Sequence, residues 1–171
     1  MQLHGSPDFT AVVLARATAL VLETVNILSA DDAMCGRNGC AVCVARIADP
    51  DTLVPLLVAQ IGFVDTQKMR RYVGLAQEKV GRLKGRNRER GHRLSRESAD
   101  QDMQQYPGAV AGGSLLVGIS GFPADVDELL SAALLVHLGD LTRDEAKTLL
   151  TQAGNAYIDR FPALCDTLHA P

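Results

Sequence analysis

Three of the four cysteines lie close together in the pattern C-x4-C-x2-C, at Cys35, Cys40 and Cys43. Thiolates at such spacing hold a structural zinc ion when the C-x2-C pair lies in a turn and a second pair of ligands completes the tetrahedron. Cys40 and Cys43 instead lie in a run of small and β-branched residues typical of a strand, where an odd separation places them on opposite faces. We therefore expect small buried cysteines, with metal binding or redox chemistry as the alternative.

Two ionisable residues fall on or beside apolar helical faces. Lys79 lies seven positions after Tyr72 and four before Leu83, so it borders the apolar stripe of its helix. Its stem either runs along apolar surface to solvent, or its ammonium points into a pocket or at a carboxylate. His137 lies on the apolar face of a later helix. There it is either a buried structural residue, or an axial ligand or pH-sensitive interface contact.

The segment Gly118-Ile-Ser-Gly121 stands directly before a helix start. Glycines let backbone N–H groups approach a ligand, and a helix N-terminus favours anions. The carboxylates of Asp125, Asp127 and Glu128 follow at once; they can satisfy those N–H groups themselves and would repel a phosphate. Asp125 and Glu128 have the spacing of a capping box. The G-x-S-G spacing differs from a nucleophile elbow, so we expect a strand-to-helix turn.

Positive charge is concentrated between Lys68 and Arg96. This segment holds eleven Lys and Arg against two acids, a local +9, whereas the other 142 residues hold six basic and eighteen acidic side chains, −12, which together give −3. A nucleic acid or another polyanion could bind such a segment. Tyr72 is its one Tyr, Phe or Trp, so it offers no platform for stacking bases. We expect a solvated loop, or a surface that pairs with acidic residues of a neighbouring subunit.

Apolar periodicity and turn signals predict seven elements that position these residues. A helix is expected to end at Gly85, followed by a solvated loop over 86–105 in which a helical turn is an open alternative. Thr142 and Glu145 predict a capping box at the start of the last helix. Residues after Pro162 are expected to form a tail, and Asp49–Asp51 a hairpin turn. The expected helices are 7–28, 65–83, 125–138 and 142–161, and the expected strands are 39–47, 53–61 and 114–120.

The order predicts one α+β domain over residues 1–171, with a core at about 7–138, a basic insert at about 84–105 and an extra C-terminal helix. The chain is 47% hydrophobic, which excludes a disordered chain. The longest apolar stretch, 11–28, is interrupted by Arg16 and Glu23, so we expect no membrane span. No basic region precedes it, as a signal peptide would require. Four cysteines in an ordinary chain suit a reducing compartment, so we expect a cytoplasmic protein.

The stretch 106–130, YPGAVAGGSLLVGISGFPADVDELL, resembles the haem-degrading and haem-binding domain family, which includes GlcG-like and HbpS-like proteins and the C-terminal domain of PduO-type proteins. Its members show a double glycine, a strand ending in a G-x-S-G-like turn, and a helix opening with Asp-Glu. Those features stand here at Gly112-Gly113, Gly118–Gly121 and Asp127-Glu128. The likeness extends over about residues 10–138, with Lys79 on the helix that follows two strands.

The resemblance implies a profilin-like or PAS-like layer that assembles into a homo-oligomer. It also implies a ligand-binding protein with a sensory or accessory role. The pocket would be bounded by Gly112, Gly113, the Ser120-Gly121 turn and Lys79, and would take a small molecule, with haem or a related tetrapyrrole as the family's ligand.

Two other hypotheses stay open. An enzyme acting on haem, a tetrapyrrole or a flavin would need an axial ligand, for which His137, Tyr106 and Cys43 are the candidates. A polyanion-binding or assembly module would use residues 68–96.

Overall fold

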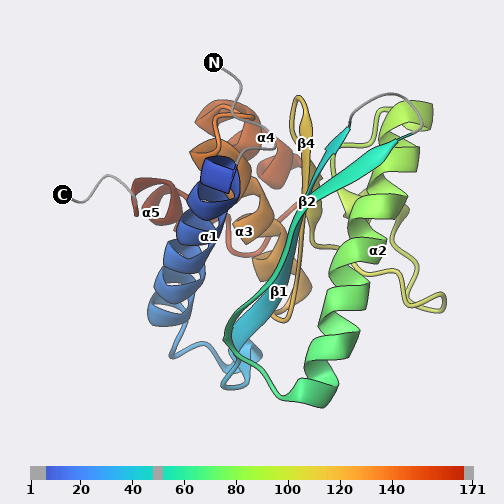
Figure 1. The fold of residues 1–171 in the computed structure, drawn as a ribbon. Helices are drawn as coiled ribbons and strands as arrows, with labels where there is room; N and C mark the ends of the chain where they lie inside the picture. Colours follow the sequence, from blue (N-terminus) through green and yellow to red (C-terminus); the bar gives the residue numbers. More distant parts are fainter. Residues whose placement is uncertain (1–6, 48–51, 168–171) are drawn as a thin grey trace.

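A computed structural model describes residues 7–47 and 52–167, and shows an α+β fold built on one four-stranded antiparallel sheet (Figure 1). The strands are β1 (Asn38–Ile47), β2 (Leu53–Phe63), β3 (Ala109–Ala111) and β4 (Leu115–Ser120), in the spatial order β2-β1-β4-β3. β1 and β2 form the predicted hairpin, whose expected turn at 49–51 lies outside the described residues. Pro55 lies in the edge strand β2, where a missing N–H is tolerated. The α+β class is confirmed.

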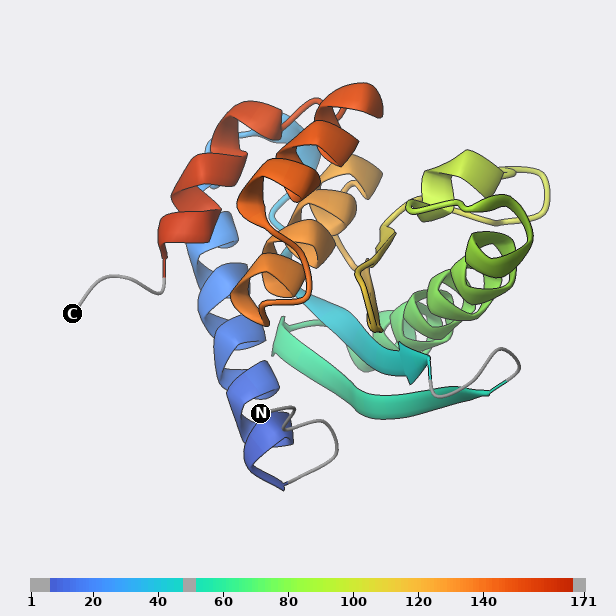
Figure 2. The same ribbon diagram turned by 90° about the horizontal axis from the view of Figure 1, so that it is seen from above.

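Helices cover both faces of the sheet (Figure 2). One face carries α1 (Pro7–Ile27), α3 (Ala124–His137), α4 (Arg143–Gln152) and α5 (Phe161–Asp166), and the other carries α2 (Thr66–Arg90). The residues of β1 alternate between two cores: Cys40, Val42 and Val44 belong to the larger core with α1 and α3, and Ala41, Cys43 and Ala45 to the smaller core with α2. The prediction that Cys40 and Cys43 are buried on opposite faces is confirmed, whereas Cys35, which was also expected to be buried, is exposed.

Small residues let α2 lie very close to the sheet. A side chain at Gly118 of β4 would place its Cβ only 2.7 Å from the backbone oxygen of Ala76. The same close approach brings Lys79, one turn further along α2, against the end of β4.

The prediction that this helix ends at Gly85 is wrong, because α2 continues to Arg90 and ends at Gly91 with a positive φ of 70°. Gly85 has open space around it and continues the helix, at the modest cost that glycine carries in a helix interior. Arg88 and Arg90 in the last turn favour the longer helix, because cations stabilise the negative end of the helix dipole. Part of the expected 86–105 loop is therefore helical, and residues Ser95–Ser98 form a short 3-10 helix.

The C-terminal region also differs from the sequence prediction. The Thr142–Glu145 capping box is confirmed at the start of α4, but this helix ends at Gln152, before Gly154 at φ 65°. The prediction of a tail after Pro162 is wrong too, because α5 packs Leu164 and Cys165 into the larger core beside Phe161. A single helix over 142–161 could not turn back over α3 in this way.

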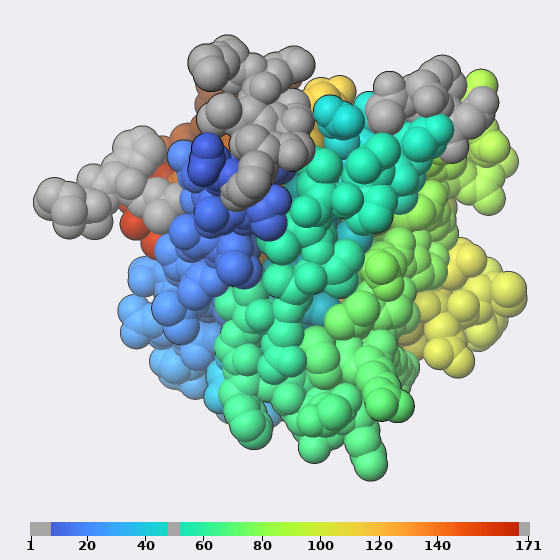
Figure 3. All heavy atoms as spheres, in the orientation of Figure 1, coloured from blue at the N-terminus to red at the C-terminus, as the bar shows by residue number. Residues whose placement is uncertain are grey.

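α1 is the one helix in the described ranges that is long and apolar enough, by length and composition, to cross a bilayer. In this structure it packs against β2 and α3, and 28% of the candidate stretch is buried. Val13 and Leu20 face the core, whereas Leu22 is 61% exposed. Figure 3 shows α1 and β2 side by side on one face of the molecule.

Candidate functional site

A cavity of about 250 Å³ opens between α2, the loop before β3 and the turn that joins β4 to α3. Its walls combine aromatic and aliphatic side chains with several charged groups. They are formed by Arg37, Arg71, Tyr72, Leu75, Lys79, Tyr106, Pro107, Ser120, Gly121, Phe122, Ala124 and Asp127.

A buried ion pair forms the floor of this cavity. The Lys79 Nζ lies 3.1 Å from Asp127 Oδ2 and donates a hydrogen bond of 2.7 Å to the carbonyl oxygen of Ile119. Lys79 is 1% exposed and Asp127 is 2% exposed. A lysine on the border of an apolar stripe thus turns inward to a carboxylate, which is one of the two outcomes the sequence leaves open.

Asp127 also fixes the turn that precedes its own helix. Its Oδ1 accepts a hydrogen bond of 3.0 Å from the backbone N–H of Phe122. The predicted capping box of Asp125 and Glu128 is wrong, because the N-cap is Pro123 and no side-chain cap is formed there. The carboxylate that holds the turn is that of Asp127, two residues after Asp125, the residue expected to cap the helix.

Burial determines the protonation equilibrium of this carboxyl group. Desolvation raises the pKa of Asp127 from 3.8 to about 6, although the Lys79 ammonium and the N–H groups of Phe122 and Gly121 all act to lower it. The carboxyl group therefore titrates near neutral pH, which is the behaviour found more often at functional sites than elsewhere.

Two polar groups at the cavity floor have unused hydrogen-bonding capacity. Ser120 is only 4% exposed, and its hydroxyl makes no hydrogen bond within the described part of the chain. An ammonium has three donors, and Lys79 uses two of them on Ile119 and Asp127.

The close packing here depends on Gly108, whose φ is +127°. A Cβ at this position would lie 2.6 Å from Lys79 Nζ and 2.8 Å from the Cβ of Asp127. Any other residue would therefore displace the ion pair.

A second, smaller hollow of about 200 Å³ adjoins the cavity. Arg37, Tyr72 and Gly121 line both, so the two form a continuous depression. The second hollow adds Lys68 and Asp65, together with exposed Phe63.

The structure brings four of the predicted site residues together at this cavity: Lys79, Tyr106, Ser120 and Gly121. The prediction that Gly112 and Gly113 bound the pocket is wrong, because both lie at the end of β4 opposite to the cavity. There Asp140 accepts hydrogen bonds from the N–H groups of Ser114 and Leu115, and a Cβ at Gly112 would overlap its carboxylate. The double glycine thus makes room for Asp140.

The other two candidate ligands lie elsewhere. His137 is 7% exposed, and its Nε2 lies 2.9 Å from the carbonyl oxygen of Leu164 in α5. Cys43 is buried in the smaller core, and desolvation raises the pKa of its thiol to about 11. Neither residue lines the cavity, and the described residues hold no group of three His, Cys, Asp or Glu that could bind a metal ion.

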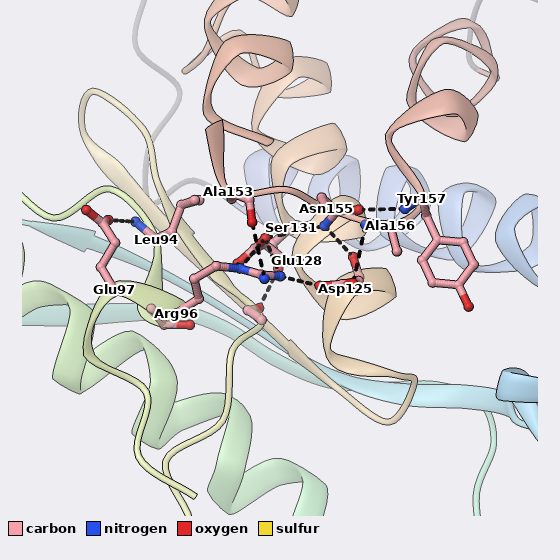
Figure 4. Close-up of polar contacts among 12 residues, drawn as sticks. Leu94, Arg96, Glu97, Asp125, Glu128, Ser131, Ala153, Asn155, Ala156 and Tyr157 are labelled. Atoms are coloured by element: carbon pink, nitrogen blue, oxygen red, sulfur yellow. Dashed lines mark hydrogen bonds and ion pairs between the residues drawn. The ribbon is translucent and has the colours of Figure 1, made fainter. Parts of the chain in front are cut away.

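Part of the basic segment is used inside the fold. Arg96 forms ion pairs with fully buried Glu128 and with Asp125, and Asn155 donates a hydrogen bond to the same Glu128 (Figure 4). Arg82 binds the backbone oxygens of Ser95, Ser98 and Tyr106. These arginines tie the loop between α2 and β3 to the body of the protein, so the expectation of a wholly solvated loop is wrong.

Sequence reasoning missed Arg37 and Arg71, which line the cavity from the loop before β1 and from α2. Both are exposed, and neither has an ion-pair partner among the described residues. The available signal was the position of Arg71, eight residues before Lys79 and therefore near it on a helical face.

No family model matches the chain, and neither the curated proteins nor the solved structures include one that matches it significantly.

Proposed function

We propose that this chain is a small-molecule-binding protein with a sensory or accessory role, and that its ligand occupies the cavity between α2 and the β4–α3 turn. The observation that carries this proposal is the set of under-used polar groups at the cavity floor. Ser120 and Lys79 are almost fully buried, yet both have donors without acceptors in the described ranges.

The Ser120 hydroxyl is not one of the buried side-chain atoms without a partner, so it opens onto the cavity that it lines and can donate to a ligand there. The ion pair is not required by the fold either, because a buried ion pair is often no better for stability than an apolar pair of similar volume. Convergent polar groups in an otherwise apolar hollow are typical of ligand pockets. A ligand that accepts hydrogen bonds from Ser120 and Lys79 would satisfy them.

Haem fits this cavity poorly. The volume of about 250 Å³ lies below the usual range for drug-sized ligands, roughly 300–1,000 Å³. Tyr106 is the one residue of the three candidate axial ligands that lines it. A smaller ligand suits the site better, and the tetrapyrrole hypothesis is tested separately by haem titration, in which a Soret shift lost in Tyr106→Phe would support it.

The proposal includes self-association into a homo-oligomer. The edge strand β2 contains no Asp, Glu, Lys or Arg, and such charges are the usual protection of an edge against pairing. Val58 and Phe63 of this strand are 39% and 77% exposed. Light scattering tests this: we expect a mass above that of one chain, lowered in Val58→Lys, and a strict monomer would contradict it.

The polyanion or assembly hypothesis receives less support. Arg82 and Arg96 are bound to groups of the same chain, and Arg93 donates to the carbonyl oxygen of Ala111. These three charges are partly withdrawn from any external polyanion. Binding of an oligonucleotide that falls steeply with salt would restore this hypothesis.

A pair of tryptophan variants tests the ligand site. Leu75 lines the cavity, so Leu75→Trp fills it, whereas Gln77→Trp adds the same ring on the exposed side of α2. We expect ligand-detected NMR on a library of small polar fragments to find binders of the natural protein and of Gln77→Trp that do not bind Leu75→Trp. An identical set of binders for both variants would refute the proposed site.

A further inference from the structure

The cavity lining is cationic although the chain as a whole is acidic. Arg37, Arg71 and Lys79 face a single carboxylate, that of Asp127, so the lining carries a net charge of about +2 when all four are ionised. The whole chain carries −3. Because Lys79 is already paired with Asp127, the excess positive charge belongs to the two arginines.

Arg37 and Arg71 differ in this respect from Arg82 and Arg96. Arg82 and Arg96 have carboxylate partners in the same chain. Arg37 and Arg71 have none among the described residues, although a guanidinium is built for bidentate pairing with a carboxylate or a phosphate. They come from separate elements and meet at one cavity.

The position of Arg37 determines where a negative group of the ligand would bind. It lines both the cavity and the adjoining hollow, so a negative group bound to it lies at the junction of the two. The hollow adds one cation and one anion, Lys68 and Asp65, so Arg37 carries the excess positive charge on that side. The cavity beyond the junction is walled by Tyr72, Tyr106 and other apolar surfaces, and ends at buried Ser120.

We infer that the ligand is a small organic oxyanion, with a carboxylate or phosphate held by Arg37 and Arg71 and an apolar or aromatic body lying against Tyr72 and Tyr106. A hydrogen-bond acceptor at the far end of that body reaches the hydroxyl of Ser120. This inference rests on the proposed function, and it adds the chemical class of the ligand.

Three probes of similar size separate the possibilities: benzoate, phenyl phosphate and neutral benzamide. Isothermal titration of the full chain at low ionic strength is expected to show binding of at least one of the two anions, at least about tenfold tighter than benzamide, because charge-assisted hydrogen bonds are about twice as strong as neutral ones. Benzoate and phenyl phosphate then distinguish the carboxylate from the phosphate.

Arginine variants identify the residues responsible. Arg37→Ala and Arg71→Ala are each expected to weaken anion binding about tenfold and leave benzamide unchanged, while Arg70→Ala, an exposed neighbour outside the cavity, has no effect. Because all three side chains are exposed, the variants should fold, which circular dichroism confirms.

The two proposals fail in different ways. Benzamide binding as tightly as the anions, with both arginine variants unchanged, overturns the oxyanion inference while the ligand site stands. If none of the three probes binds, the inference is also overturned. The proposed ligand site is refuted as well only if the same fragments bind to Leu75→Trp and Gln77→Trp.

Discussion

A variant in which the buried ion pair is replaced by a neutral pair shows, by comparison with the natural protein, how the titration of Asp127 changes stability. In Lys79→Met/Asp127→Asn, methionine keeps most of the length of the lysine, and asparagine keeps an oxygen for the N–H of Phe122. The double variant has no group here that titrates between pH 4 and pH 8. The difference in unfolding free energy between the natural protein and this variant therefore isolates the pair.

The sign follows from the direction of the pKa shift. The pKa of Asp127 rises on folding, so its contribution to stability is fully present below pH 3.8 and is lost as the pH rises through about 6. A shift of about 2 units corresponds to about 3 kcal/mol, at about 1.4 kcal/mol per unit. The natural protein should lose about 2 kcal/mol of this relative to the double variant between pH 4 and pH 7, because at pH 4 more than half of the unfolded-state carboxyl is already ionised.

Urea denaturation followed by circular dichroism, at half-unit steps from pH 4 to pH 8, measures this difference. The single variant Lys79→Met provides a second test. Its destabilisation should grow with pH to about 3–5 kcal/mol, because Asp127 then loses the buried ammonium that pairs with it. The difference in unfolding free energy could instead stay flat or rise with pH. That result would show that the attraction of Lys79 lowers the pKa of Asp127 more than desolvation raises it, and would refute this reasoning.

Three further predictions concern the scaffold of the site, each measured by the same urea denaturation. Gly108→Ala should lower stability by about 2 kcal/mol or more, because its Cβ would lie 2.6 Å from the buried ammonium of Lys79. The control Gly74→Ala, a helical position with open space around it, should raise stability by up to about 1 kcal/mol. Equal effects of the two changes would contradict the close packing around Gly108. Arg96→Ala should cost about 3 kcal/mol by leaving Glu128 buried without its cation, and adding Glu128→Gln should recover part of that loss; no recovery would mean that Arg96 acts through packing alone. Phe161→Ala should cost about 3–5 kcal/mol, because this side chain is 1% exposed in the larger core; a loss below about 1 kcal/mol would contradict the packing of α5 into that core.

Local patterns predicted the framework of the fold well. The run of small and β-branched residues along Gly39–Ile47 is typical of a buried strand, and the apolar stripe of α2 is typical of a helix with one buried face, so both could be placed from local patterns. Boundaries were less predictable. Gly85 and Gly91 are the same residue type six positions apart near one helix end, and the local pattern does not distinguish which of them ends α2.

The candidate site could be predicted only in part, for a similar reason. Lys79, Ser120 and Gly121 were found from local spacing and from the family resemblance. The pairing of Lys79 with Asp127 joins residues 48 positions apart, and nothing local in the sequence encodes it. Arg37 lies in a loop whose direction depends on the chain turns around it, so its place at the cavity was invisible before the sheet was assembled.

The topology of the sheet also has a consequence for the order of folding. β1 pairs on one side with β2, its neighbour in the chain, and on the other with β4, through pairs such as Val44 and Val117. Contacts between residues so distant in sequence form slowly. During synthesis the β1–β2 hairpin emerges first, with an apolar strand edge exposed until β4 follows.

The residues made in that interval are those of α2 and the arginine-rich segment after it. Their positive charges therefore accompany the nascent hairpin while its inner edge has no partner. Like charges on neighbouring nascent chains repel one another. The chain up to Arg96 holds 14 basic and 9 acidic side chains, a net charge of +5, so we expect repulsion between emerging chains to oppose association of the incomplete sheet before the acidic remainder is made.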